Sequence, residues 1–116
     1  MAKNKRIVAV YKKSLALGEV LRVLHDTAAG VYYLAYGGAI TPLIDAEGRP
    51  TRGELYDGRF EVLANQGAME VFRVVRDRAT AVCYMTYAGG YQTSLIPMVD
   101  AEGRILTSNT TTLTEL

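Results

Sequence analysis

The sequence is poor in the residues that most often carry chemistry or cross-link a chain. Its 116 residues include one cysteine, one histidine and no tryptophan. A lone Cys83 cannot form an intrachain disulfide, and together with His25 it falls short of the roughly four ligands of a zinc site. The Asp-Ala-Glu-Gly segments are too short for a calcium loop. The sequence therefore predicts no disulfide, no metal centre and no cofactor.

Net charge and long apolar runs are also lacking. Thirteen Lys and Arg against twelve Asp and Glu leave a net charge of +1, so no strong field draws the chain to nucleic acid or to an anionic membrane. No apolar run approaches membrane-spanning length, and Ile7–Tyr11 is too short for a signal peptide. We expect a cytoplasmic protein without a membrane partner. The basic residues within 3–13 are interpreted as a solubilising strand edge rather than a nucleic-acid site.

The sequence does contain one stretch that occurs twice. Val31–Arg49 and Val82–Arg104 each run as a Tyr-rich apolar segment, a Gly-Gly pair, a proline with apolar neighbours, and Asp-Ala-Glu-Gly-Arg. Repeats of about fifty residues are small for independent folding. We therefore expect a single domain over residues 1–116. It would consist of two repeats, at about 6–51 and 59–107, that share one core and are joined by a linker at 52–58.

Residue patterns predict strands in both repeats. Glu70–Arg76 is too rich in β-branched residues for a helix, and this decides the equivalent Glu19–His25, which alone could pass for an amphipathic helix. We expect an all-β fold of two tandem β-meanders of about four strands each, related by a pseudo-twofold axis in a small sandwich or barrel-like arrangement. The residues expected to be mostly buried are Leu21, Val23, Tyr33, Leu43, Phe72, Val74, Tyr84 and Met98.

Turn chemistry recurs at matching places. Asp26–Gly30 and Asp77–Ala81 are predicted hairpin loops, in which the Asp carboxylate bonds the following amides. Ala81 stands where Gly30 would supply a left-handed residue, at a cost of about 1 kcal/mol. Asp45–Gly48 and its second copy fit a type I turn. Short return strands are expected after these turns, over residues 49–51 and 104–107.

These motifs resemble a known family. Ala29–Leu34, Tyr36–Ala39 and Thr41–Pro50 are similar to Thr-Gly-Val-x-Tyr-Leu, Tyr-Gly-Gly-Gly and Thr-Pro-Leu-Leu-Asp-x-x-Gly-Lys-Pro. That pattern is typical of the small bacterial and phage proteins grouped as domain of unknown function family number 6440. Its members usually carry one copy, often with Asn where this chain has Tyr32 and Cys83. The resemblance implies a tandem version descended from a homodimer, and it implies no activity.

The glycine pairs are the candidate binding site. Their backbone amides allow close approach of phosphate or carboxylate, and tyrosines beside them can stack on a base. In the competing interpretation the glycines only turn the sheet, while the arginines are solvated or paired with Glu19 and Glu70. The candidate ligand-binding residues are Arg22, Tyr36, Gly37, Gly38, Thr41, Arg73, Tyr87, Gly89, Gly90, Tyr91, Thr93 and Ser94.

No nucleophile, base and orienting acid recur together, so we expect no enzyme and no catalytic residues. Strands with two half-apolar faces need cover that one small chain cannot supply, which predicts a homo-oligomer. We predict a non-catalytic, oligomeric binding module for a small anionic or nucleotide-like ligand. By analogy, small phage proteins that sequester nucleotide signals fit this profile. The alternative is a structural or protein–protein interaction module.

Overall fold

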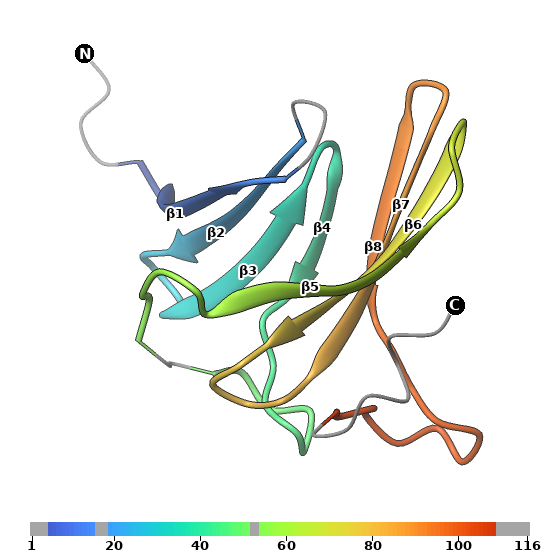
Figure 1. The fold of residues 1–116 in the computed structure, drawn as a ribbon. Coiled ribbons are helices and arrows are strands. Elements are labelled where there is room, and N and C mark those ends of the chain that lie inside the picture. The colour runs from blue at the N-terminus through green and yellow to red at the C-terminus, as the bar shows by residue number, and fades with distance from the viewer. Residues whose placement is uncertain (1–4, 16–18, 52–53, 109–116) are drawn as a thin grey trace.

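A computed structural model describes residues 5–15, 19–51 and 54–108, and within them it contains eight strands and no helix. The strands form two four-stranded antiparallel sheets, each in simple chain order and neither closed into a barrel (Figure 1). The prediction of an all-β fold with two tandem meanders is confirmed. The first sheet contains β1 (Ile7–Ser14), β2 (Val20–Asp26), β3 (Val31–Tyr36) and β4 (Ala39–Pro42). The second contains β5 (Phe60–Gln66), β6 (Glu70–Asp77), β7 (Cys83–Gly89) and β8 (Gln92–Pro97).

The hairpin loops have the predicted chemistry in both sheets. The Asp26 carboxylate accepts hydrogen bonds from the amides of Ala28 and Ala29 at 3.0 and 3.2 Å. Gly30 has a φ of +77°, and Ala81 takes the same left-handed conformation at +68°. Both β2 and β6 are strands, so the second copy correctly decided the conformation of the first.

The Asp-Ala-Glu-Gly turns form as expected, but the return strands that should follow them do not. The Asp45 carboxylate accepts the amides of Glu47 and Arg49, each at 2.9 Å. Beyond this turn the chain makes only an isolated bridge between Ile44 and Pro50. A proline has no amide to donate, and so it cannot extend a ladder. The second copy likewise shows isolated bridges instead of a return strand.

Each sheet has two distinct faces, because side chains alternate along a strand. We call one the L face, after Leu21. Its members are Leu21, Val23, Leu34, Tyr36 and Thr41 in the first sheet and, at equivalent positions, Phe72, Val74, Met85, Tyr87 and Ile96 in the second. We call the other the R face, after Arg22. Its members are Arg22, Leu24, Tyr33, Ala35 and Ile40 in the first sheet and Arg73, Val75, Tyr84, Thr86 and Leu95 in the second.

The core lies where the L face of the first sheet packs on the R face of the second. Leu21 and Leu34 from the first sheet belong to one buried cluster with Val75, Tyr84 and Leu95 from the second. A twofold axis would bury the same face of both copies. The twofold relation expected from the repeat therefore does not extend to the packing, which joins non-equivalent faces head to tail.

Burial of the predicted core residues follows from this packing. Five of them are buried, namely Leu21, Val23, Leu43, Val74 and Tyr84. Tyr33, Phe72 and Met98 are partly buried and lie outside the main buried cluster. Tyr33 and Phe72 lie on the two faces that point away from the core. A small second cluster of Ala64, Val74 and Cys83, with Met98 against it, forms on the outer side of the second sheet.

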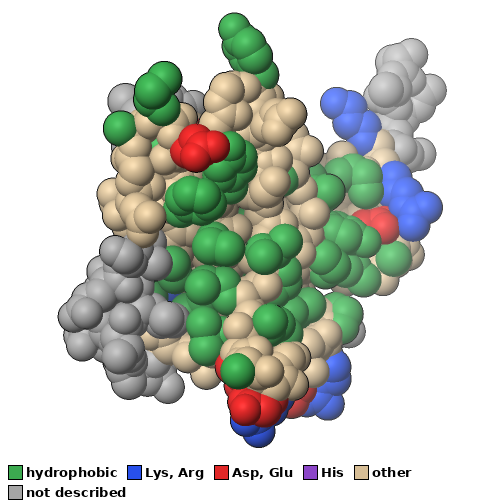
Figure 2. Space-filling view, turned by 90° about the vertical axis from the view of Figure 1, so that its right-hand side faces the viewer, with side chains coloured by type: hydrophobic (Ala, Val, Ile, Leu, Met, Phe, Trp, Pro, Cys, Tyr) green, Lys and Arg blue, Asp and Glu red, His purple; other side chains and the backbone are tan. Residues whose placement is uncertain are grey.

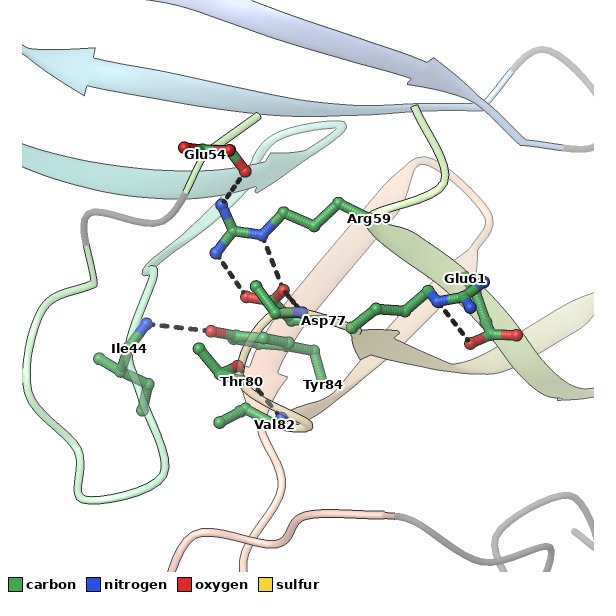
Figure 3. Close-up of polar contacts among 10 residues, drawn as sticks. Ile44, Glu54, Arg59, Glu61, Asp77, Thr80, Val82 and Tyr84 are labelled. Atoms are coloured by element: carbon green, nitrogen blue, oxygen red, sulfur yellow. Dashed lines mark hydrogen bonds and ion pairs between the residues drawn. The ribbon is translucent and has the colours of Figure 1, made fainter. Parts of the chain in front are cut away.

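Polar groups fix the junction between the copies. Arg59 is fully buried and donates two hydrogen bonds to Asp77, at 2.7 and 2.8 Å, and a third to the Glu54 carbonyl (Figure 3). The Ile44 amide of the first copy donates to the Tyr84 hydroxyl oxygen of the second at 3.1 Å. Burial raises the pKa of Tyr84 to about 12. The Ile44–Tyr84 bond fixes how the first copy sits on the second, whereas the Arg59 bonds hold together the second copy and the segment that leads into it.

Candidate functional site

A cavity of about 250 Å³ lies at the junction of the two copies, beside the β3–β4 turn. Both copies contribute to its wall, so it exists only because the repeats pack together. Four residues predicted for the binding site line it, namely Arg22, Tyr36, Gly37 and Thr93. The remaining lining residues are Glu19, Val20 and Ala88.

The Glu19 carboxylate is the most densely contacted group in this wall. The Tyr36 hydroxyl donates to its Oε1 at 2.6 Å, and Arg73 from the second sheet donates to the same oxygen and forms an ion pair with it. Burial, together with the bond to Glu19, raises the pKa of Tyr36 to about 12. The Tyr36 phenol therefore stays neutral at physiological pH, and Arg73 is already committed to a partner within the chain.

Arg22 differs from Arg73 in this respect. The two arginines occupy equivalent positions in β2 and β6, but Arg73 is 5% exposed while Arg22 is half-buried against the cavity. No hydrogen bond or ion pair joins Arg22 to any other residue that the structure describes. Because Arg73 and Glu19 neutralise one another, Arg22 leaves the wall with an uncompensated positive charge.

The first glycine pair is the two-residue turn between β3 and β4. Gly37 has a φ of +57°, and a Cβ added there would lie 2.7 Å from the Thr93 side chain. The Gly38 amide donates to the Thr93 hydroxyl at 2.9 Å. The close approach that glycine permits here is therefore to β8 of the other copy. This turn holds the two sheets together at the edge of the cavity.

The second glycine pair is placed differently. Gly89 ends β7 and pairs with Gln92, so that the turn residues are Gly90 and Tyr91. Tyr91 is fully exposed, and a Cβ on Gly90 would meet nothing within 4 Å. This loop is the tip of a hairpin and does not line the cavity.

The other predicted site residues also lie outside the lining. Thr41 is buried within β4, and Ser94 is exposed on β8. The Tyr87 hydroxyl donates to Glu70 at 3.0 Å, which repeats the pair of Tyr36 and Glu19 on the outer side of the second sheet. This bond raises the pKa of Tyr87.

The sequence indicates Glu19 and Glu70 only as possible partners of the arginines. Their recurrence, directly before β2 and at the first position of β6, is the available indication of a role. The pairing of Glu19 with Arg73 spans 54 positions. It depends on which faces meet, and no local pattern shows that. The apolar wall residues Val20 and Ala88 carry no distinguishing mark in the sequence.

Fold and site together define an all-β protein made of two fused four-stranded meanders with a cavity at their junction. The family model described as "Family of unknown function (DUF6440)" matches residues 6–51 and again residues 59–108. The two matches span most of the chain, and the chain therefore belongs to this family as a tandem, two-copy member. No curated protein and no solved structure matches it. In the described part of the chain, no helix has the length and apolar character needed to cross a membrane.

Proposed function

We propose that this protein is a non-catalytic binding module that assembles with copies of itself and holds a small anionic ligand in the cavity between its repeats. The observation that carries the proposal is the unpaired guanidinium of Arg22 in the cavity wall. A guanidinium presents five N–H donors in a fixed fork that matches phosphate and carboxylate. An anion entering the cavity would supply the partner that Arg22 lacks.

The rest of the wall suits a ligand with a planar apolar part. Val20 and Ala88 offer apolar contact, and Thr93 adds a hydroxyl beside the buried Tyr36. Ligand cavities commonly measure about 300–1,000 Å³. A volume of about 250 Å³ therefore suits a small anion or one part of a nucleotide. Sequestration of a nucleotide-like signal, as small phage proteins perform, is the form of this function that we favour.

The first experiment is native mass spectrometry of the protein purified from cells, followed by binding assays with inorganic phosphate and a panel of nucleotides. Arg22→Gln should weaken binding about 10- to 150-fold, because a charge-assisted hydrogen bond contributes about 1.5–3 kcal/mol. Arg49→Gln is the matched control, because Arg49 is exposed on the Asp45 turn, away from the cavity. Equal affinities for the parent protein and Arg22→Gln would refute the site.

The second candidate function is an interaction module, and exposed apolar residues favour it. Ile40 and Ile96 are each more than half exposed on outer sheet faces. A protein that copurifies in fixed stoichiometry, with no bound small molecule, would favour this candidate over ligand binding. Turnover of a bound ligand would instead indicate an enzyme.

A further inference from the structure

We infer that the protein assembles head to tail, by docking the outer L face of the second sheet of one copy on the outer R face of the first sheet of the next. The contact would repeat between chains the packing that already joins the two repeats within one chain. This inference rests on the self-assembly in the proposed function and does not depend on its ligand.

The exposed residues occupy the positions that the interior contact buries. On the R face, Leu95 of the second sheet is 5% exposed, whereas its equivalent Ile40 in the first sheet is 55% exposed. On the L face, Thr41 is 6% exposed and its equivalent Ile96 is 52% exposed. Each repeat thus has one face covered by the other repeat and one outer face, on which Ala35 and Val74 are buried by their neighbours while Ile40 and Ile96 are exposed. Isoleucine stands at both uncovered positions, where a solvent-facing sheet would be expected to carry polar residues.

Figure 2 shows the side of the molecule that carries β6, β7 and β8, with hydrophobic side chains gathered across its middle. The L-face residues Phe72, Met85 and Ile96 belong to this outer side and are half-buried or exposed. Their equivalents Leu21 and Leu34 are at most 1% exposed in the core. The apolar surface is therefore of the same kind as the one that already packs against an R face.

Charges on the two outer faces complement one another in the same way. Within the chain, Glu19 on the L face of the first sheet accepts a hydrogen bond from Tyr36. It also pairs with Arg73, which comes from the R face of the second sheet. On the outer L face, Glu70 is bound by Tyr87 but pairs with no arginine in the described part of the chain. On the outer R face, Arg22 has no carboxylate among the described residues. Docking one outer face on the other would bring Arg22 to Glu70 of the next copy, as Arg73 meets Glu19.

A second polar contact has matching equivalents. The interior bond from the Ile44 amide to the Tyr84 hydroxyl corresponds to Val99 and Tyr33 on the outer faces. Val99 is 56% exposed and Tyr33 is half-buried, so both can be reached.

Pairing of Arg22 with Glu70 also leaves other guanidinium donors for an anion in the cavity, since the group carries five N–H donors.

Docking of unlike faces has a distinctive consequence. Each chain offers one outer L face and one outer R face for docking. The assembly therefore closes into a ring or grows as a filament, and it does not stop at a symmetric dimer. Blocking either face alone therefore abolishes assembly. Two chains blocked on opposite faces retain one intact contact between them.

The test uses the full chain with Ile40→Asp, which blocks the R face, and Ile96→Asp, which blocks the L face. Sedimentation velocity at micromolar concentration should show an associated parent, two monomeric variants and a one-to-one dimer when the variants are mixed. Met69→Asp is the matched control. Met69 is 91% exposed in the β5–β6 turn, outside both faces, and its variant should sediment like the parent.

Charge exchange provides a second set of variants in case a blocked face disturbs folding. Arg22→Glu and Glu70→Arg should each be monomeric alone and should associate when mixed, because both junctions then pair opposite charges. A monomeric parent, a blocked variant that still forms dimers, or a mixture that stays monomeric would overturn the inference. Ligand retained by the monomeric Ile40→Asp and Ile96→Asp variants would support the cavity independently of assembly, whereas ligand retained by Arg22→Glu would count against the cavity, because that variant lacks the guanidinium in its wall. Loss of ligand in a normally assembling protein would count only against the cavity.

Discussion

Arg59 and Asp77 form a two-point ion pair in which neither side chain is exposed to solvent. The same pair occurs in the first copy as Arg6 and Asp26, with nearly the same geometry, but there the arginine side chain is 64% exposed. The sequence is repeated and the environment is not. The second copy turns its R face inward, and the first turns it outward.

This difference predicts unequal costs for the same substitution. Arg59→Ala should lower the free energy of unfolding by about 3–5 kcal/mol, because it leaves a buried carboxylate without its partner. Arg6→Ala should cost much less, because water and salt already screen an exposed pair. Urea unfolding of both variants measures the difference. Similar losses in the two variants would show that the Arg59 pair is not the more buried one in solution.

The left-handed residues at the ends of the hairpin loops give a second prediction. Ala81→Gly should stabilise the fold by up to about 1 kcal/mol, since it removes the strain of an Ala at positive φ. Gly30→Ala should destabilise it by a similar amount through φ alone, because nothing lies within 4 Å of the added Cβ. Thermal unfolding of both variants tests this. A stabilising Gly30→Ala would contradict it.

The two glycine turns provide a matched comparison. Gly37 and Gly90 have φ values of +57° and +59°, but only at Gly37 would a Cβ collide with Thr93. Gly37→Ala should therefore cost more stability than Gly90→Ala, and the excess reports the contact between the copies. If chemical denaturation finds the two variants equally stable, then the β3–β4 turn does not pack against β8 in solution.

Buried tyrosine predicts how stability depends on pH. The pKa of Tyr84 rises from 10.0 to about 12, chiefly through burial. A raised folded-state pKa means that this contribution is fully present below about pH 10 and is lost as the pH rises toward 12. Unfolding free energies measured across this range should fall with pH.

Tyr84→Phe is the variant that isolates this effect. Its stability should be lower at neutral pH, because the Ile44 amide loses its acceptor. The fall between pH 10 and 12 should become shallower, because one late-ionising phenol is gone. Tyr36 also ionises late, with a pKa raised to about 12, and should account for part of the slope that remains. If the unfolding free energy of Tyr84→Phe falls between pH 10 and 12 as steeply as that of the parent, then ionisation of Tyr84 does not cause the fall.

The strands and turns could be predicted because their causes are local. β-Branched residues in Glu70–Asp77 exclude a helix, and the Asp26 and Asp77 carboxylates each bond amides that follow them within the loop. Even the strained Ala81 could be found by comparing the repeats.

The packing of the sheets could not be predicted in the same way. Both faces of β3 and β7 carry apolar residues, so alternation identifies the faces without indicating which of them is covered. The sequence therefore does not show that Tyr33 and Phe72 lie outside the main buried cluster, and its repeat favours a twofold relation. The cavity and the pairing of Arg73 with Glu19 both depend on which faces of the two sheets pack together. Local sequence patterns therefore could not predict either of them.

Fusion of the two copies changes how their shared contact responds to dilution. The short stretch between Thr51 and Arg59 keeps the L face of one repeat permanently close to the R face of the other. Such tethering commonly gives a local concentration of about millimolar. A single-copy relative with the same faces would have to find its partner in solution, and would release it as expression falls. In this chain the contact between the two repeats forms at any abundance, because one polypeptide carries both of its sides.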